Sequence, residues 1–277
     1  MNILLTGSKG FVGKNILKTF SKSYKIFSLQ NGSKYIRTKK KIICNLLKKD
    51  HINMILKEDL IIDVIIHTAS KLSSVSNMQS KSILQENILM YEHLSIIINK
   101  FDPKQVINLS STAVYPNKDG VYTETSEIKP SENNDCYYGI SKIIGENILD
   151  FKCKKSKILN LRVAQIYGPG MRKDRVYEIM KKDLIKKNTI FVYGMGRRVS
   201  GFIHIDSLIK KIKICINKKL CGIFNIADSN LSYKQLALKI IKEFGNKKSK
   251  IKLLNSGLSN KTFINFSKFR KIEKNIN

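Results

Sequence analysis

The chain opens with ILLTGSKGFVG at residues 3–13, a short apolar run followed by glycines at every third position. The run is typical of a buried strand, and the pattern over 11–20 is helical. At such a junction the first glycine permits a tight turn, the second lets a pyrophosphate reach the backbone, and the third lets the helix pack closely. The helix N-terminus also offers free N–H groups to phosphate. An ordinary glycine-rich turn is the alternative, and the position between strand and helix argues against it. We therefore expect a dinucleotide-binding turn made of Gly7, Lys9, Gly10, Phe11, Val12 and Gly13.

Further apolar runs alternate with helical patterns along the first part of the chain. Strands are expected at 3–5, 25–29, 61–67, 106–109 and 158–163, and helices at 11–20, 50–58, 81–99 and 137–151. Strands that are apolar on both faces and separated by helices indicate a parallel sheet covered on two sides. The expected fold class is therefore α/β, with a Rossmann-type doubly wound parallel sheet.

After about residue 167 the pattern becomes looser. Helices are expected near 174–187, 207–217 and 232–244, with short strands around 190–192 and 223–227. We expect a Rossmann domain for NAD(P) over 1–166 and a smaller, mixed substrate-binding region over 167–277, interleaved with the sheet. The tail from Lys247 is basic and weakly patterned, so no element is assigned to it.

The net charge of +30 has two explanations, an anionic partner or a coding bias toward lysine. Lysine outnumbers arginine 44 to 7, and the lysines are spread along the whole chain. Base readout and base stacking rely on arginine and aromatic side chains, which are scarce among these lysines. The composition therefore favours bias over a nucleic-acid partner, although the charge would still attract a diphosphate.

The five cysteines are scattered and form no CxxC pair, which argues against a disulfide framework and a zinc site. No apolar run approaches the roughly 20 residues of a membrane span. The N-terminus has neither the basic nor the apolar region of a signal peptide. We expect a cytoplasmic protein with no membrane partner and no metal.

Tyr138 and Lys142 form a YxxxK pattern inside a predicted helix, so the phenol and the ammonium share one helix face. A free tyrosine has a pKa of about 10, and a nearby ammonium and a cationic nicotinamide would favour the phenolate. Ser111 follows the carboxyl end of the strand expected at 106–109. Ligands of such sheets bind at the carboxyl ends of strands. We therefore predict that Tyr138 exchanges a proton with a sugar hydroxyl, that Lys142 orients the cofactor ribose, and that Ser111 hydrogen-bonds the reacting oxygen. The alternatives are a surface Tyr–Lys pair and a hydroxyl-rich turn.

The second predicted strand ends at Gln30 without the acidic residue that usually holds the adenine ribose of NAD. Lys9, Lys34 and Arg37 lie nearby in sequence, and a 2′-phosphate needs cations. This pattern leans weakly to NADP. In the alternative, Gln30 hydrogen-bonds the ribose of NAD.

Together these residues resemble the extended short-chain dehydrogenases/reductases of the NAD-dependent epimerase/dehydratase family, which act on nucleotide-diphosphate (NDP) sugars. The resemblance covers about 1–245. Its markers are TGSKGFVG (6–13), DVIIHTAS (63–70), LSSTAVYP (109–116), YYGISK (137–142), LRVAQIYGPG (161–170), GFIHIDSL (201–208) and FNIADS (224–229).

The resemblance implies a role for each matched position. Gly7, Gly10 and Gly13 would hold the pyrophosphate, and Ser111, Tyr138 and Lys142 match the catalytic triad. Further cofactor-binding residues would be Thr68, Ala69, Ser70 and Asn87, and the substrate-binding residues would be Ser73, Ser111, Thr112, Arg197 and Arg198. We expect His67 and His204 to be structural.

Several departures from the family pattern narrow the expected activity. Dehydratases of the family carry an acidic pair after the catalytic Ser or Thr, where this chain has Thr112 and Ala113, which argues against 4,6-dehydration. The GDP-fucose synthase branch has a Cys at the first of these positions and a later His, and both are missing here. The usual arginine before the FIH segment is Ser200, so Arg197 and Arg198 are the expected substitutes.

The expected function is thus hydride transfer at a carbon of a nucleotide sugar, with C4 as the expected carbon, by an epimerase or a 4-ketoreductase. The expected cofactor is NAD or NADP, and the expected assembly is a homodimer through the helices at 81–99 and 137–151. The alternative is a nonenzymatic NAD(P)-binding regulator or an RNA-binding protein on the same fold, which the intact triad argues against.

Overall fold

A large sheet forms the centre of the computed structural model, which describes residues 1–74, 76–78 and 80–275. In the described residues it has eight strands in the order β12-β8-β6-β5-β1-β2-β4-β3. All neighbours are parallel except β3 and β4. The strands are β1 (Asn2–Thr6), β2 (Lys25–Gln30), β3 (Ile36–Arg37), β4 (Lys41–Ile43), β5 (Val64–His67), β6 (Gln105–Ser111), β8 (Lys157–Val163) and β12 (Gly222–Ile226).

The chain builds this sheet outward from β1 in two directions, first through β2 and β4, then back through β5, β6 and β8. The strand order therefore reverses beside β1, and a crevice forms there at the carboxyl ends of the strands. This is the doubly wound Rossmann-type fold predicted from the alternating pattern.

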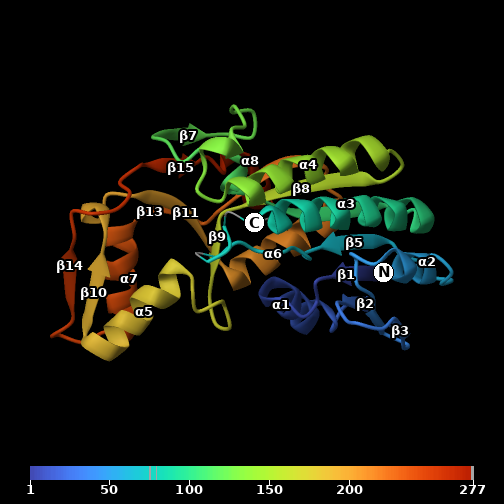
Figure 1. Ribbon diagram of the computed structural model, residues 1–277, viewed down its shortest axis with the longest axis horizontal. Helices are drawn as coiled ribbons and strands as arrows, with labels where there is room; N and C mark the ends of the chain where they lie inside the picture. The colour runs from blue at the N-terminus through green and yellow to red at the C-terminus, as the bar shows by residue number, and fades with distance from the viewer. Residues whose placement is uncertain (75, 79, 276–277) are drawn as a thin grey trace.

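Helices cover both faces of the sheet because its strands are apolar on both sides. Ile3 and Leu5 pack with α1 (Phe11–Phe20) and α6 (Ile205–Asn217), whereas Leu4 packs with the helices of the opposite face. Figure 1 shows α3 and α4 on one side of the sheet and α1 on the other. The helices of the opposite face are α2 (Lys49–Ile55), α3 (Lys81–Phe101) and α4 (Cys136–Lys152).

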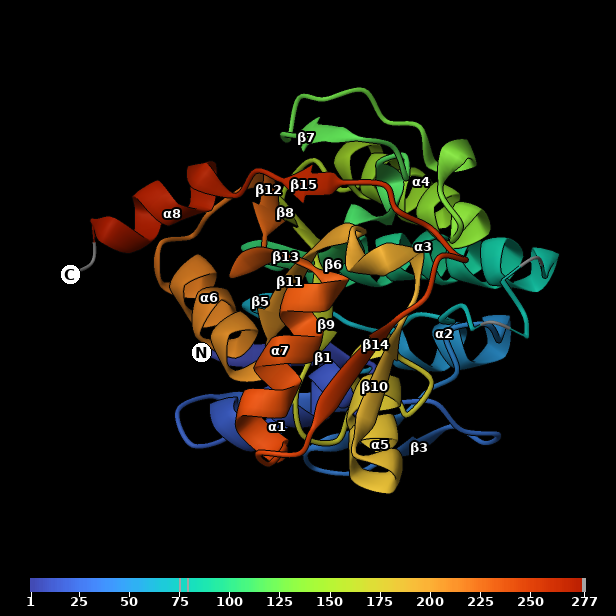
Figure 2. The ribbon, with the colours of Figure 1, turned by 90° about the vertical axis from the view of Figure 1, so that its left-hand side faces the viewer.

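A smaller region lies beyond the carboxyl ends of the strands, at the left of Figure 1 and facing the viewer in Figure 2. Its core includes Tyr177, Met180, Leu184, Leu236 and Ile240. The region is made of β9 (Gln165–Tyr167), α5 (Val176–Lys187), β10 (Thr189–Val192), β11 (Val199–His204), β13 (Ser229–Ser232), α7 (Tyr233–Phe244) and β14 (Lys250–Leu253).

The predicted helices and strands are present with small shifts at their ends, and one feature, the structure of the tail, goes beyond the prediction. The strand expected at 223–227 is β12, the edge strand of the main sheet, so the chain after residue 167 contributes to the sheet. The unassigned tail forms β14, then β15 (Thr262–Ile264), which pairs with β7 (Gly120–Tyr122), and finally α8 (Ser267–Lys274). Within the described ranges, no helix is both long and apolar enough to cross a bilayer.

Candidate active site

A cleft of about 830 Å³ lies between the carboxyl ends of the sheet strands and the smaller region. Most of the site residues expected from the sequence line it, and they come from both parts of the chain. Those in the lining are Gly7, Lys9, Gly10, Phe11, Val12, Gly13, Thr68, Ala69, Ser70, Ser73, Ser111, Thr112, Tyr138, Lys142 and Arg198. Gln30, Asn87 and Arg197 are not in the lining.

The glycine turn has the three properties expected of it. Gly7 has φ of +68°, and a Cβ there would lie 2.6 Å from the backbone nitrogen of Ala69. A Cβ on Gly13 would lie 2.3 Å from the carbonyl oxygen of Gly7, so α1 packs directly on the turn. A Cβ on Gly10 would meet only the Gly7 oxygen, at 3.2 Å, because this residue is exposed in the cleft.

Gly10 is also the N-cap of α1 and gives the helix no side-chain cap, so the first N–H groups of α1 face an open, glycine-lined space. An anionic pyrophosphate is the group that this arrangement suits. The turn therefore fits a dinucleotide.

The loop after β5 is held by hydrogen bonds to β1 and to a buried side chain behind the cleft wall. The Thr68 hydroxyl donates to the Thr6 carbonyl at 2.7 Å, which fixes this loop on β1. Asn87, buried on α3, accepts from the Ser70 hydroxyl at 3.1 Å and donates to the Ser141 hydroxyl at 3.2 Å. Asn87 thus positions Ser70 and α4 from behind the cleft wall.

Helix α4 presents Tyr138 and Lys142 to the same part of the cleft, with the Lys142 Nζ 5.4 Å from the centre of the Tyr138 ring. Ser111 ends β6, and its hydroxyl accepts from the Ala113 backbone at 3.1 Å. A Cβ on Gly139 would lie 2.3 Å from the Ala113 carbonyl oxygen. Because Gly139 has no side chain, α4 approaches the turn after Ser111 closely enough for both to line one cleft.

Burial moves the pKa values of the phenol and the amine in opposite directions. Burial raises the pKa of Tyr138 to about 12, opposed by the Ser70 hydroxyl and the Arg175 charge and reinforced by Asp135. Burial lowers the pKa of Lys142 to about 7, opposed by the Glu146 carboxylate. Near neutrality Tyr138 is therefore a phenol, and additional positive charge in the cleft would favour its phenolate.

The two histidines of the family motifs occupy structural positions. The buried His67 has its Nδ1 2.8 Å from the Thr6 hydroxyl, and burial, with the Lys142 charge adding, lowers its pKa to about 3. His204 is the N-cap of α6, and its side chain accepts from the Asp206 backbone.

Two arginines at the start of α5 were not expected from the sequence. Arg172 and Arg175 both line the cleft and donate to the Ser73 carbonyl, at 3.4 Å and 2.9 Å. The Ser73 hydroxyl donates to Asp135 at 2.7 Å, just before the first turn of α4. The sequence offered one signal for this pair: the chain has only seven arginines, and these two are close together in the sequence. Arginine is used where several hydrogen bonds must be made at once, so such a pair indicates a binding role.

The other two candidate arginines have different surroundings. Arg198 lines the cleft with its guanidinium 5.1 Å from the centre of the Tyr233 ring, and its buried Nε has no partner within the described residues. Arg197 is exposed. The geometry therefore makes Arg198 the available cation of this pair.

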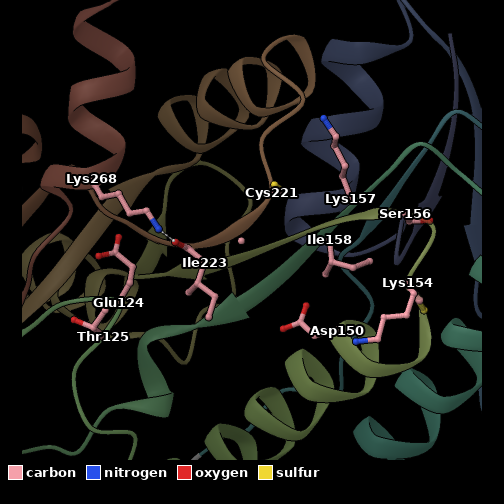
Figure 3. Close-up of a pocket in the computed structure, with 12 residues that line it drawn as sticks. Glu124, Thr125, Asp150, Lys154, Ser156, Lys157, Ile158, Cys221, Ile223 and Lys268 are labelled. Carbon is pink, nitrogen blue, oxygen red and sulfur yellow. Dashed lines mark hydrogen bonds between the residues drawn. The ribbon is translucent and has the colours of Figure 1, made fainter.

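A second, shallower depression of about 600 Å³ lies where β8 and β12 begin (Figure 3). Asp150, Lys154, Cys221, Ile223 and Lys268 are among its lining residues, and no site residue expected from the sequence is. In the described part of the chain, no three His, Cys, Asp or Glu side chains gather where they could hold a metal.

Comparisons with known proteins agree with the fold. The family model described as "NAD dependent epimerase/dehydratase family" matches residues 3–227. An uncharacterised UDP-glucose epimerase of Bacillus subtilis is 24% identical, over 79% of this chain and 73% of its own length.

Two solved structures share this fold over nearly the whole chain. The UDP-glucose 4-epimerase of Thermotoga maritima with UDP-glucose has a TM-score of 0.80 at 21% identity, covering 98% of this chain and 92% of its own. The dTDP-glucose 4,6-dehydratase of Bacillus anthracis with NAD has a TM-score of 0.77 at 19% identity, covering 99% and 90%.

Proposed function

The chain belongs to the NAD-dependent epimerase/dehydratase family, and from that premise we propose that it transfers hydride at a carbon of a nucleotide sugar, as an epimerase or a 4-ketoreductase. The observation that carries the proposal is that Ser111, Tyr138 and Lys142 line the same cleft as the glycine turn. The reacting carbon in this proposal is C4.

The residues of the proposed triad have different tasks. Tyr138 takes the proton from the sugar hydroxyl, or returns it to the keto oxygen, and Ser111 hydrogen-bonds that same oxygen. The Lys142 ammonium favours the phenolate and orients the ribose of the dinucleotide. When bound, the dinucleotide supplies the hydride acceptor or donor. Gly10 leaves its pyrophosphate room against the backbone, and Gly7 and Gly13 allow the tight turn and the close packing of α1 that shape this space.

The substrate half of the cleft suits a diphosphate linked to a sugar. Arg198 would contact the diphosphate, and Ser73 and Thr112 would hydrogen-bond the sugar. Arg197, being exposed, would take part only after moving toward the cleft. The UDP-glucose bound to the Thermotoga epimerase of the same fold supports this ligand class.

Water elimination is not part of the proposal, although a 4,6-dehydratase shares the fold. A dehydratase must move a second proton and release a hydroxyl, which the acidic pair of the family dehydratases serves. Thr112 and Ala113 at the matching positions have no ionisable side chain.

The choice between NAD and NADP depends on the end of β2. No acid follows this strand, which favours NADP. Arg37 is already engaged, because its Nε is 3.2 Å from a Glu58 carboxylate oxygen and its guanidinium lies against the Phe27 ring. Of the cations considered, Lys9 lines the cleft, whereas Lys34 and Arg37 do not. Lys9 is therefore the residue proposed to meet a 2′-phosphate, and Gln30 is the one proposed for the ribose of NAD.

We further propose a homodimer built on α3 and α4, which pack against each other along their length (Figure 1). Ile96 on α3 and Phe151 on α4 are exposed apolar side chains on these helices. The proposed location is the cytoplasm, and the division at residues 166 and 167 is proposed as a functional one, between cofactor and substrate binding.

The experiment is to purify the protein, identify the dinucleotide that it retains, and offer UDP-, GDP- and dTDP-sugars in turn. Tightly retained NAD with interconversion of two epimers supports an epimerase. Exchangeable NADPH that the protein oxidises while it reduces a nucleotide keto-sugar supports a reductase. Absence of turnover with every sugar, together with binding of RNA that survives moderate salt, would replace the proposal with the nonenzymatic alternative.

A further inference from the structure

A row of polar side chains crosses the middle of the apolar sheet directly behind Lys142. Thr6, His67, Asn108 and Asn160 occupy matching register positions on β1, β5, β6 and β8. All four are at most 1% exposed. Buried polar groups at aligned positions on four strands are costly unless they are hydrogen-bonded. Here Thr6 bonds the His67 Nδ1, Tyr91 bonds Asn108, and Asn108 bonds Asn160, whereas the His67 Nε2 has no partner within the described residues.

Tyr91 on α3 joins this row to Lys142. Its hydroxyl accepts from the Lys142 Nζ at 3.2 Å and donates to the Asn108 Oδ1 at 3.0 Å. The His67 ring lies 5.0 Å from the Tyr91 ring, between centres. Tyr91 is 1% exposed and does not line the cleft, so it reaches Lys142 from behind.

The hydrogen bonds continue in one direction beyond Tyr91. Asn108 Nδ2 donates to Asn160 Oδ1 at 2.8 Å, and Asn160 Nδ2 donates to both Asp150 oxygens at 3.4 Å. Asp150 lies at the second depression, shown in Figure 3. Each donor in the series is polarised by the next, and the carboxylate at the end makes the Tyr91 oxygen a better acceptor for an ammonium.

The Tyr91 ring has room only because residue 145 is a glycine. A Cβ at Gly145 would lie 2.2 Å from Cε2, 2.4 Å from Cζ and 2.5 Å from Cδ2 of the Tyr91 ring. The ring is enclosed on its other side by the sheet, so it could not move away without leaving Lys142. The pair Tyr91 and Gly145 thus forms one contact between α3 and α4.

Lys142 has few other acceptors. Its Nζ donates to the Leu109 carbonyl at 2.9 Å, and its side chain is 2% exposed. With Tyr91 this accounts for two of the three N–H groups and leaves the third for the cleft. The titratable groups around it are Glu146 and Tyr138 on α4 and His67 on β5. Burial keeps the His67 ring neutral.

We propose that Tyr91 is a positioning residue for Lys142 and fixes its ammonium at the inner wall of the cleft. In this proposal Gly145 provides the space that the Tyr91 ring occupies. This inference rests on the proposed role of Lys142. Tyr91 exchanges no proton itself. Burial raises its pKa well above the ordinary value, reinforced by Tyr138 and Glu146 and opposed by the Asn108 hydrogen bond.

The test begins with Tyr91→Phe, which removes the hydroxyl and keeps the ring. One ammonium N–H then loses its acceptor, so the charged form of Lys142 is disfavoured. We expect kcat to fall about tenfold, KM for the sugar to change less than about twofold, and the alkaline limb of the kcat profile to move about one pH unit lower, the scale of one hydrogen bond to a charged group. Tyr35→Phe is the control, since that hydroxyl bonds Glu58 at 2.7 Å outside the cleft.

A second readout needs no sugar. The dissociation constant of NADH, or of NADPH where that binds more tightly, is measured by fluorescence from about pH 5 to about pH 9, a range that spans the Lys142 pKa of about 7 and the lower value expected in the variant. In the wild type, binding should weaken as Lys142 loses its proton, and in Tyr91→Phe the weakening should begin about one pH unit lower. This titration reports on Tyr91 even where no nucleotide sugar is turned over.

Gly145→Ala tests the same contact from the other helix. It should reproduce the kinetic and binding changes of Tyr91→Phe, and should have little effect in a Tyr91→Leu background, where the ring is gone. The proposal is overturned if Tyr91→Phe keeps the wild-type kcat, pH profile and NADH titration while Lys142→Met is inactive. Wild-type protein that turns over no sugar, with Lys142→Met binding NADH as the wild type does, would instead overturn the proposed function.

Discussion

Arg162 on β8 and Glu146 on α4 form a two-point ion pair, with Nε 3.1 Å from one carboxylate oxygen and Nη2 2.8 Å from the other. Both side chains are 2% exposed. The same guanidinium donates to the Tyr115 hydroxyl at 3.1 Å, and Ser110 donates to Glu146. One buried carboxylate therefore fastens α4 to β8, one turn after Lys142.

Replacing Glu146 with alanine should destabilise the fold strongly, because Arg162 would be left charged and buried without its partner. We expect the free energy of unfolding to fall by about 3–5 kcal/mol. Urea unfolding followed by circular dichroism measures this. Asp183→Ala is the matched control, because it breaks an exposed pair with Lys187 and should cost less than about 1 kcal/mol. Equal losses in the two variants would contradict the role given to the pair.

Gly10→Val should block dinucleotide binding without unfolding the protein. The new side chain would project into the cleft, where only the Gly7 oxygen is near, and would occupy the pyrophosphate approach. We expect NADH affinity to fall at least about tenfold, and the melting temperature to stay close to that of the wild type. In Gly13→Val the side chain would meet the Gly7 backbone, so that variant should also melt earlier. Normal NADH binding by Gly10→Val would show that the turn does not hold the cofactor.

Tyr138→Phe should leave cofactor binding near normal and lower kcat by about 10² or more, the scale of general acid–base catalysis. The ring stays in place, and only the hydroxyl that exchanges the proton is removed. Steady-state kinetics with the sugar found active, combined with an NADH titration, separate the two effects. Turnover close to that of the wild type would remove Tyr138 from the mechanism.

Lys142 should make stability depend on pH in a defined window. Its folded pKa of about 7 lies below the ordinary 10.5, so between these values the unfolded chain holds a proton that the folded chain has released. The free energy of unfolding therefore rises with pH across this window, and the cost of the buried ammonium is largest below about pH 7.

Lys142→Met removes this cost. We expect the variant to exceed the wild type by roughly 2–5 kcal/mol at pH 6, from about 1.4 kcal/mol per pKa unit, and the difference to shrink toward pH 10. Urea unfolding at pH 6, 8 and 10 measures the difference. Since both proteins share every other titrating group, parallel curves would mean that the Lys142 pKa is not lowered.

Lys9→Ala should weaken NADPH more than NADH, because Lys9 lines the cleft and is the residue proposed to meet a 2′-phosphate. We expect about a tenfold greater loss for NADPH, the equivalent of one charge-assisted contact. Fluorescence titration with both dinucleotides measures the ratio, with Lys34→Ala as the control. Equal losses for both would indicate a contact with the pyrophosphate that they share.

The local features of this fold could be predicted from the sequence because their physical causes lie within a few residues. The spacing of Gly7, Gly10 and Gly13 satisfies a strand-to-helix turn, and a helix places Tyr138 and Lys142 on one face whatever surrounds it. The apolar runs required a sheet buried on both sides. The order of the family motifs predicted further residues of the cleft lining, such as Thr68, Ala69 and Ser73, but not Arg172 and Arg175.

Contacts between residues far apart in the chain could be identified only from the tertiary structure. The alignment of His67, Asn108 and Asn160 depends on strand register, which a one-residue slip would destroy. The tail gave no periodic pattern because β14 and β15 are short strands paired with distant partners. The sequence by itself determined that Tyr138 and Lys142 share one helix face and that the glycine turn joins a strand to a helix. Only packing decided that Tyr91 reaches Lys142, because that contact requires α3 and α4 to meet at Gly145, where the missing side chain leaves space for the Tyr91 ring.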